Sequence, residues 1–470
     1  MGSPGLRRAR DKMTQAGVDT TAIEVFSHYY RLLEHGETGM IPEATVEPLD
    51  MESLDDVEVT DEQAAAAIRG TVVIKLNGGL GTSMGMDRAK SLLCVRRGLS
   101  FLDIIARQVL HARGQYDATL PLIFMNSFRT SEDTMAALAR YEDLPVEGLP
   151  LEFLQNKEPK LLENGLAPVS YPKNPDLEWC PPGHGDLYTA LLGTGLLDQL
   201  IEAGYTTCFV SNADNLGAVP VARVAGWFAA SGAPFAIEAV RRTPSDKKGG
   251  HFARRKGDGR IVLRETAQTL PGDQAALADL DRHRFCSTNN LWFDLVAMRD
   301  TLVAREGVLG LPLIRNIKNV DPADPTTPKV IQVETAMGAA IEVFADSRTI
   351  EVGRDRFVPV KTTNDLLLLR SDVYDIGSDF VLDKVADQVP YVELDADYYK
   401  LVGDFDKRFP EGAPSMKRAT SLRVDGDWTF GHGVRVVGAA ALEEKATAQR
   451  VEPGAVLGET AKAGSGVADG

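Results

Sequence analysis

The strongest constraint on the fold is a regular alternation of short apolar runs with longer helical stretches. Strands that are apolar along their whole length are buried on both faces of a sheet, and intervening helices allow parallel connections between them. The chain is therefore predicted to have an α/β fold with a mostly parallel mixed sheet. The apolar runs are TVVIKL (71–76), LPLIFMNS (120–127), LEFLQN (151–156), TTCFVSNADN (206–215) and PFAIEAV (234–240).

Helices are predicted between these runs, at 100–115, 133–141, 184–204 and 221–231. Ser100 and Asp103 stand at capping-box spacing at the start of the first helix. In parallel sheets, ligands bind outside the carboxyl ends of the strands. Several of the apolar runs end in three or four polar or glycine residues, namely NGG, MNS, LQN and SNAD. We therefore expect these strand ends to form one edge, and the chemistry to lie there.

Three parts of the chain are predicted. Residues 1–66 are predicted to form a helical segment and an acidic linker, because apolar residues at helical spacing are followed by a stretch, 46–63, with eight acids and no bases. Such a stretch is typical of a solvated linker or a surface segment. Residues 67–376 form the α/β domain. Residues 377–470 contain TFGHGVRVVG and VEPGAVLG, spaced like β-solenoid rungs or ordinary β turns, and end in a flexible-looking tail.

The composition excludes several classes of protein. The net charge of −16 disfavours non-specific binding to nucleic acid and to anionic membranes. No apolar stretch approaches the roughly 20 residues of a membrane helix, and no apolar signal region follows the basic start of the chain. The four cysteines lack metal-ligand spacing, and Cys94, Cys208 and Cys286 are predicted as reduced core thiols. A cytoplasmic enzyme is expected.

Glycines are concentrated in KLNGGLGTSMGMDRAKS (75–91), directly after the first apolar run. A dinucleotide fingerprint does not fit, because GLGTSMG is one residue too long for GxGxxG. A Walker A loop would need glycines where the chain has Met84 and Ala89. A flexible loop rich in backbone N–H groups and followed by Lys90 still suits an anion, although a simple tight turn fits the same residues.

The loop closely resembles the signature of the eukaryotic-type UTP–glucose-1-phosphate uridylyltransferase (UDP-glucose pyrophosphorylase) family. Further blocks resemble that family in the same order over about 300 residues. The resemblance implies a GT-A-like (Rossmann-like) nucleotidyltransferase core with an N-terminal helical part and a C-terminal left-handed β-helix. The blocks are MNSF (125–128), PPGHGD (181–186), FVSNADNLGA (209–218), TNNLW (288–292), VIQVETAMGAAI (330–341) and RFVPVKTTNDLLLL (356–369).

The reaction implied by the resemblance is in-line attack of glucose 1-phosphate on the α-phosphorus of UTP, giving UDP-glucose and pyrophosphate with Mg²⁺. Such a reaction needs positioning and charge neutralisation more than covalent help. Lys361 and Lys90 are the implied catalytic residues, with Lys361 at the α-phosphate and Lys90 on the triphosphate. Asp214 is the implied Mg²⁺ ligand; from its position alone it could equally be a turn or helix-cap residue. The family also implies subunit contacts through the C-terminal domain.

Base and sugar contacts follow from the same blocks. The Gln155 amide offers a donor and an acceptor to uracil. A sugar phosphate is already ionised at neutral pH and needs no base, so His184 is expected to contact it and not to act as a nucleophile; a helix-capping role is the alternative. The implied nucleotide contacts are Leu76, Asn77, Gly78, Gly79, Lys90, Gln155, Gly183, Asp214 and Lys361, and the implied substrate contacts are Gly78, Gly79, His184, Asn212, Asp214, Glu265 and Asn290.

Other functions fit parts of the same pattern. The same chemistry could act on galactose 1-phosphate or N-acetylglucosamine 1-phosphate, although Ser83 stands where the N-acetylhexosamine enzymes usually carry arginine. A glycosyltransferase would be expected to show a DxD-type motif, and the chain reads NAD around Asp214. A non-catalytic nucleotide-sugar scaffold would be expected to lose its charged residues, and Lys90, Asp214 and Lys361 are all present.

Overall fold

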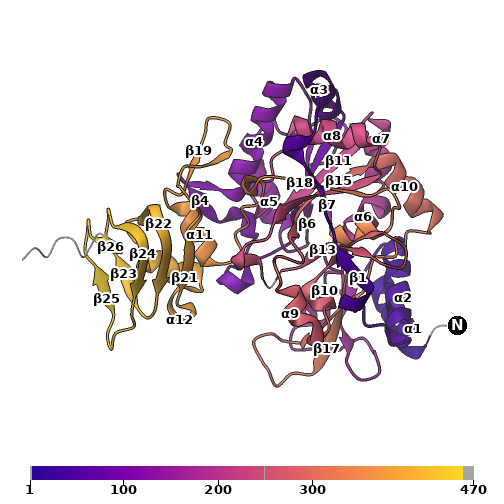
Figure 1. The fold of residues 1–470 in the computed structure, drawn as a ribbon. Helices are drawn as coiled ribbons and strands as arrows, with labels where there is room; N and C mark the ends of the chain where they lie inside the picture. Colours follow the sequence, from indigo (N-terminus) through magenta and orange to yellow (C-terminus); the bar gives the residue numbers. More distant parts are fainter. Residues whose placement is uncertain (1–2, 248, 459–470) are drawn as a thin grey trace, which may run out of the picture.

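A computed structural model describes residues 3–247 and 249–458, and its centre is an eight-stranded sheet (Figure 1). β15 runs antiparallel to both of its neighbours, and every other pair in the sheet is parallel. The predicted mostly parallel mixed sheet is therefore confirmed. In spatial order the strands are β2 (Glu52–Ser53), β18 (Arg348–Glu351), β12 (Phe235–Arg241), β15 (Phe285–Asp294), β11 (Thr207–Asn212), β3 (Thr71–Asn77), β6 (Leu122–Asn126) and β7 (Glu152–Leu154).

The sheet is covered on both faces because its strands are apolar on both sides. In β3, Val73 packs into one hydrophobic core, whereas Val72 and Ile74 pack into another on the opposite face. The first core takes side chains from α3 (Asp61–Arg69), α4 (Phe101–Tyr116), α5 (Ser131–Leu138) and α8 (Ala222–Ser231). The second takes them from α6 (Asp186–Gly193), α7 (Leu196–Glu202) and α10 (Leu295–Ala304).

The helix predictions hold with one correction. The capping box at the start of α4 is formed by Ser100 and Asp103, as predicted. The single helix expected over 184–204 is instead two helices, α6 and α7. Gly195 separates them with a φ of +71°, a left-handed conformation that glycine adopts without steric cost and that ends a right-handed helix.

The N-terminal helices α1 (Pro4–Gln15) and α2 (Thr20–Glu34) form their own small core against β9 (Leu161–Leu162) and β17 (Lys329–Glu334). The following acidic stretch lies largely at the surface, which was one of the two predictions from its charge, but it is not a free linker. It contributes β1 (Val46–Pro48) to a sheet with β13 (His251–Arg255) and β14 (Ile261–Arg264), and it supplies β2 to the central sheet. The apolar residues interspersed among its acids, Val46 and Leu49, are buried and make this possible.

The C-terminal part is built from parallel strands, as predicted for a solenoid. β21 (Tyr391–Leu394), β22 (Ser415–Val424), β24 (Arg435–Leu442) and β26 (Val456–Gly458) form one sheet, and β23 (Trp428–Phe430) pairs with β25 (Gln449–Val451). Trp428 pairs with Gln449, and Arg435 pairs with Val456. The sequence separation is the same in both pairs, so the segment TFGHGVRVVG stacks in register on the segment VEPGAVLG, as two rungs of a solenoid would. A left-handed coil and subunit contacts through this part stay predictions, and the predicted tail beyond residue 458 lies outside the described residues.

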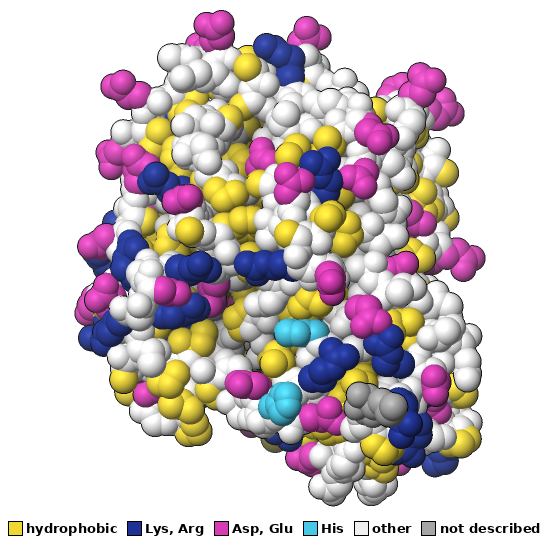
Figure 2. Space-filling view, turned by 90° about the vertical axis from the view of Figure 1, so that its right-hand side faces the viewer, with side chains coloured by type: hydrophobic (Ala, Val, Ile, Leu, Met, Phe, Trp, Pro, Cys, Tyr) yellow, Lys and Arg dark blue, Asp and Glu magenta, His cyan; other side chains and the backbone are white. Residues whose placement is uncertain are grey.

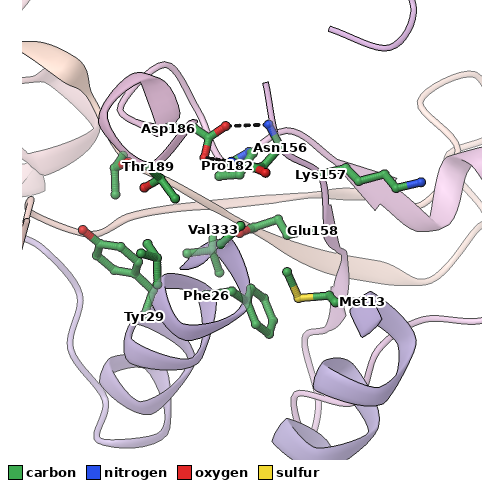
Figure 3. A pocket seen from close by; sticks show the side chains of 13 residues that line it. Met13, Phe26, Tyr29, Asn156, Lys157, Glu158, Pro182, Asp186, Thr189 and Val333 are labelled. Atoms are coloured by element: carbon green, nitrogen blue, oxygen red, sulfur yellow. Dashed lines mark hydrogen bonds between the residues drawn. The ribbon is translucent and has the colours of Figure 1, made fainter. Parts of the chain in front are cut away.

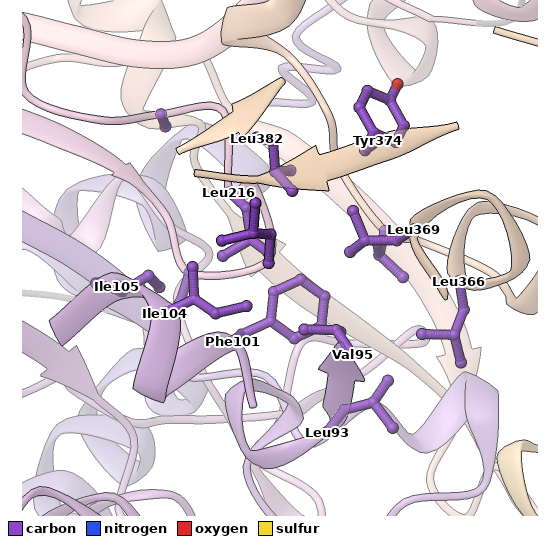
Figure 4. Close-up of a cluster of buried hydrophobic side chains, with 14 of the residues drawn as sticks. Leu93, Val95, Phe101, Ile104, Ile105, Leu216, Leu366, Leu369, Tyr374 and Leu382 are labelled. Carbon is purple, nitrogen blue, oxygen red and sulfur yellow. The ribbon is translucent and has the colours of Figure 1, made fainter. Parts of the chain in front are cut away.

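The core continues across the predicted boundary at residues 376 and 377. The hairpin of β19 (Tyr374–Ile376) and β20 (Leu382–Lys384) straddles that point. Its side chains Tyr374 and Leu382 pack with Phe101 of α4 and with Leu366 of α11 (Thr363–Arg370), as Figure 4 shows. The C-terminal part therefore shares one core with the helices of the α/β domain.

The surface agrees with the mixed charge of the sequence. On the face shown in Figure 2, acidic and basic side chains are interspersed, with apolar side chains between them. Within residues 3–247 and 249–458, no helix is long and apolar enough to cross a membrane. Cys180, Cys208 and Cys286 are buried free thiols, whereas Cys94 is exposed, which corrects its assignment to the core.

Candidate active site

A pocket of about 310 Å³ lies at the carboxyl ends of the central strands. The strand ends are in register, because Asn77 of β3 pairs with Asn126 of β6, and Leu76 pairs with Asn212 of β11. The predicted edge is therefore confirmed. The pocket is lined by Leu76, Asn77, Gly78, Gly79, Lys90, Ser91, Met125, Gln155, Pro181, Gly183, His184, Asn212, Ala213 and Asp214.

The glycine loop is shaped by left-handed residues at both ends of a short turn. Gly81 (φ +67°) and Gly85 (φ +75°) flank the 3₁₀ turn Thr82–Met84, a conformation that disfavours any residue with a Cβ. The Lys90 N–H donates to the Gly79 carbonyl over 3.1 Å and so folds the loop back on itself. A Cβ on Gly85 would lie 3.2 Å from Leu401, so the C-terminal part packs against the loop.

The predicted uracil contact is held in place from two sides. Gln155 Nε2 donates to the Gly183 carbonyl over 2.9 Å. A Cβ on Gly78 would lie 2.8 Å from Gln155 Oε1, so glycine is needed there to make room for the amide. At Gly183 (φ +80°) a Cβ would meet the backbone of Thr335 at 2.5 Å, so the neighbouring segment by itself requires glycine here.

Behind Gln155 lies a second, enclosed cavity of about 20 Å³, shown in Figure 3. Asp186, at the start of α6, accepts from the backbone N–H and the side-chain amide of Asn156 over 2.6 and 2.9 Å. Burial raises the pKa of Asp186 to about 7 and raises the pKa of Glu158 on the opposite wall well above its ordinary value. These contacts fix the backbone that follows Gln155, so the amide is oriented before any ligand arrives.

Lys90 and Asp214 form an ion pair inside the pocket. Lys90 Nζ donates to Asp214 Oδ2 over 2.8 Å and also to the Val360 carbonyl. Asp214 Oδ1 is buried and has no hydrogen-bond partner among the described residues. An unsatisfied carboxylate oxygen is costly, and it is the kind of ligand that Mg²⁺ prefers. The site therefore has a free oxygen suited to the predicted metal ion.

Lys361 lies beside the pocket at an exposed position, just before α11. The Val360 N–H donates to the Asp214 carbonyl over 3.1 Å, and the Lys361 N–H donates to Asp365 Oδ2 over 2.8 Å. Its backbone is thus tied down on both sides. Within the described part of the chain, its ammonium has no hydrogen-bond or ion-pair partner.

The charge of Lys361 affects the pKa values of both His184 and Glu265. His184 Nδ1 accepts from the Met337 N–H over 3.0 Å, so the ring is held by Nδ1 and its Nε2 is left for a ligand. The ring lines the pocket, where desolvation, with Lys361 adding to it, lowers the pKa of the imidazole to about 4. Burial raises the pKa of Glu265, and Lys361 opposes that shift. Of these three residues only His184 lines the pocket, and the charge of Lys361 acts on both of the others.

Two predicted asparagines are placed differently. Asn212 lines the pocket at the end of β11. Asn290 does not: its side chain is fully buried and donates to Glu238 Oε2 over 3.0 Å and to the Arg356 carbonyl over 3.3 Å. Its predicted sugar contact is therefore not supported by its position. Asn77 also turns its side chain away from the pocket, because it donates to Asn126 and Thr134 and only borders the pocket.

Four pocket residues were not predicted, and three of them, Met125, Pro181 and Ala213, carry no chemical signal. Ser91 is different because its hydroxyl is buried and lacks a partner in the part of the chain that the structure describes. Its position directly after Lys90 could have indicated it.

A second group of possible metal ligands, Glu43, His251 and His283, lies near β14. The two imidazole rings are stacked, with centroids 3.7 Å apart and planes 19° apart. Ligand lone pairs lie in the ring plane, so nearly parallel rings cannot both aim at one ion. Glu43 already accepts from Arg264, Arg282 and His283. This geometry does not suit a bound metal ion.

Known proteins resemble this chain over most of its length. The family model of UTP–glucose-1-phosphate uridylyltransferase matches residues 23–436. The UTP–glucose-1-phosphate uridylyltransferase of Astragalus penduliflorus is 36% identical over 391 residues, which cover 82% of this chain and 80% of the relative. A probable enzyme of the same name from Schizosaccharomyces pombe is 36% identical over 370 residues, covering 78% of this chain and 71% of the relative.

Solved structures agree. A variant of UDP-glucose pyrophosphorylase from Leishmania major, in complex with UDP-glucose, has a TM-score of 0.91 and 40% identity, covering 97% of this chain and 98% of that one. A UDP-glucose phosphorylase from Trypanosoma brucei gives the same TM-score, identity and coverage. With the family model spanning most of the chain and the pocket residues in their predicted blocks, the chain belongs to the UTP–glucose-1-phosphate uridylyltransferase family.

Proposed function

We propose that the chain transfers the uridylyl group of UTP to glucose 1-phosphate with the help of Mg²⁺, forming UDP-glucose and pyrophosphate. The observation that carries this proposal is a cluster of three charged groups at a glycine-lined pocket. Among the described residues, one lysine forms an ion pair with a carboxylate, that carboxylate keeps one oxygen without a hydrogen-bond partner, and a second lysine has an unpaired ammonium. Lys90, Lys361 and Asp214 make up that cluster. Family membership supports the same reaction.

The chemical step is a direct displacement at the α-phosphorus. A phosphate oxygen of glucose 1-phosphate forms the new P–O bond, the bond from the α-phosphorus to the bridging oxygen breaks, and pyrophosphate leaves with its electron pair. The nucleophile is ionised at neutral pH, so no protein base is required. The protein must align two polyanions and neutralise the charge that gathers on the α-phosphate oxygens.

Lys361 suits that charge-neutralising role because its ammonium is free and its backbone is fixed next to Asp214. Lys90 suits the triphosphate, since it already lies in the pocket beside the glycine loop. Asp214 would hold Mg²⁺ through Oδ1, its oxygen without a partner. When bound, Mg²⁺ supplies further neutralisation of the phosphate charge.

The two ends of the substrates have distinct contacts. Gln155 would pair with the uracil edge, with Leu76 to Gly79 and Gly183 bordering the nucleoside. His184 is neutral at pH 7, so it can offer Nε2 to the sugar phosphate without carrying a charge. Asn212 and Glu265 are the remaining candidates for the glucose hydroxyls. They approach from β11 and from the end of β14.

The test is a pyrophosphate-release assay with Mg²⁺, pairing UTP and other nucleoside triphosphates with several sugar 1-phosphates. We expect the highest kcat/KM for UTP with glucose 1-phosphate and no turnover without a divalent cation. A higher value with galactose 1-phosphate or N-acetylglucosamine 1-phosphate would replace the proposed sugar. UDP-glucose binding without turnover of any pair would identify a scaffold and overturn the proposal.

A further inference from the structure

A buried polar network is centred on Glu238 of β12. Glu238 is fully buried, and its two carboxylate oxygens accept four hydrogen bonds. Arg356 donates Nε to Oε2 over 2.9 Å and a terminal nitrogen to Oε1 over 2.6 Å. Trp292 and Asn290 donate the other two, over 2.9 and 3.0 Å. The guanidinium of Arg356 and the carboxylate of Glu238 thus form a bidentate ion pair, and the other two donors occupy the remaining lone pairs of the carboxylate. Such an arrangement is rigid.

A β-bulge makes room for this network. The pairing of β12 with β15 shifts register between Ile237 and Ala239, on either side of Glu238. Opposite the shift, Asn289 adopts a left-handed φ of +58°, and Thr288 donates to the Glu238 carbonyl over 2.8 Å. The bulge turns Asn290 inward to Glu238. Bulges of this kind re-aim side chains next to active sites.

Arg356 connects Glu238 to the two segments that carry the reactive groups. Its guanidinium donates to the Val219 carbonyl over 2.6 Å, in the segment that follows Asp214. Its own backbone stands in the segment that leads to Lys361. A Cβ on Gly217 would lie 2.1 Å from the Asp355 carbonyl oxygen, so the two segments pass in direct contact.

Asn215 joins the same two segments from the other side. Its Oδ1 accepts from the Val358 N–H over 2.9 Å, and its Nδ2 donates to the Arg356 carbonyl over 3.1 Å. Asn215 also forms a β-bridge with Pro359. It is the residue directly after Asp214, and Pro359 stands two residues before Lys361. A shift of Asn215 would therefore move the carboxylate and the lysine relative to one another.

Stability alone does not explain such a network. Replacing a buried ion pair by well-packed apolar side chains is often neutral or stabilising, so a pair of this kind is weak support for a purely structural role. What the contacts do fix is the distance between Asp214 and Lys361. Reacting groups must be held within fractions of an ångström for efficient transfer.

We propose that Glu238, Arg356 and Asn215 are positioning residues, which hold Lys361 at a set distance from Asp214 so that both meet the α-phosphate of UTP. This inference rests on the proposed function. It assigns no contact with substrate to the three residues. It also gives Asn290 a role in the same network, in place of a sugar contact.

The test variant is Asn215→Ala, which removes both clamping hydrogen bonds without leaving a buried charge. We expect its kcat to fall by about 10- to 100-fold. The KM for UTP and the Kd for UDP-glucose should stay within about threefold of wild type, since the pocket lining is unchanged. Glu238→Gln serves as the second variant, with urea unfolding to establish that each protein is folded.

A double-mutant cycle separates positioning from general damage. If Asn215 acts through Lys361, Asn215→Ala should slow the Lys361→Ala enzyme by no more than about twofold. Glu342→Gln is the matched control, because Glu342 is a buried carboxylate paired with Arg255 away from the pocket. It should leave kcat unchanged.

Three results would overturn the inference: an unchanged kcat in Asn215→Ala, the same loss in both backgrounds, or an equal loss in Glu342→Gln. The failure of the proposed function looks different. If the proposed function is wrong, the wild-type protein itself will form no UDP-glucose. If only the positioning role is wrong, the wild-type protein will be active and the variants will give one of the three results above.

Discussion

Lys90 lines the pocket and Lys361 lies beside it, and the protein holds these two like charges differently. Lys90 is half-buried and bound to Asp214 and to the Val360 carbonyl. Lys361 is exposed, and its ammonium has no partner in the described part of the chain, although its backbone is fixed. One lysine is engaged before the substrate arrives, and the other is free to respond to it.

This difference separates two tasks that a phosphate site combines. An engaged lysine orders the carboxylate beside it and adds to ground-state binding. A free lysine on a fixed backbone can make its best contact in the transition state, which is where an interaction raises kcat. The predictions below test that division.

The largest effect is expected for Lys361→Ala. The variant should lose about 10³-fold in kcat, because charge on the α-phosphate would no longer be neutralised. The Kd for UDP-glucose, measured by calorimetry, should change by less than about threefold. Lys445→Ala, an exposed lysine far along the C-terminal part, is the control. A large loss of binding with little loss of kcat would reverse the assignment of the two lysines.

A smaller loss, about 10²-fold in kcat/KM for UTP, is expected for Lys90→Ala. Because Lys90 also orders Asp214, the Mg²⁺ concentration for half-maximal rate should shift as well. Titration of Mg²⁺ at saturating UTP measures this shift. The Lys361→Ala variant should show no such change. If both variants respond identically to Mg²⁺, the comparison between the lysines fails.

Gly78→Ala is expected to act on the nucleotide side alone. The new Cβ would lie 2.8 Å from Gln155 Oε1 and displace the amide. The KM for UTP should rise about tenfold with kcat changed little, which is the opposite of the Lys361 pattern. Gly114→Ala in α4, where a Cβ would meet nothing within 4 Å, is the control. An unaltered KM would remove Gln155 from base recognition.

The smallest effect concerns pH. Lys75 is buried, and burial together with Arg356 lowers its pKa from 10.5 to about 7. Between these values the unfolded chain holds a proton that the folded chain has released, so stability rises with pH. The free energy of unfolding of wild type should therefore rise relative to that of Lys75→Met between pH 7 and pH 10. Urea unfolding of both proteins across that pH range measures the difference in their free energies of unfolding. If this difference does not change with pH, the lowered pKa of Lys75 is contradicted.

The sheet was predictable from the sequence because apolar strands and helices alternate with little ambiguity. The helix break at Gly195 was not predicted because glycine is tolerated within helices, and nothing in the local sequence marks this glycine as the one with a positive φ. The acidic stretch was misjudged for a similar reason. Charge dominates its composition, but two apolar residues, Val46 and Leu49, are enough to dock it.

The pocket was predictable where a motif lies at a strand end, as for Asn212 and Asp214. Asn290 shows the limit of that approach. It stands in a block as well matched as theirs, but strand residues alternate between faces, and a bulge at Glu238 decides which asparagine points inward. A bulge leaves no mark in a single sequence. The polar network centred on Glu238 was missed for the same reason, since its members are scattered along the chain.

The contact between Gly85 and Leu401 has a practical consequence. The C-terminal parallel strands look like a separable module, and truncation after β20 would be a natural way to isolate the α/β domain. Such a fragment would lose the side chain that supports the turn Thr82–Met84 and would expose core residues of the hairpin. Nucleotide affinity should therefore be measured with the C-terminal strands still attached to the α/β domain.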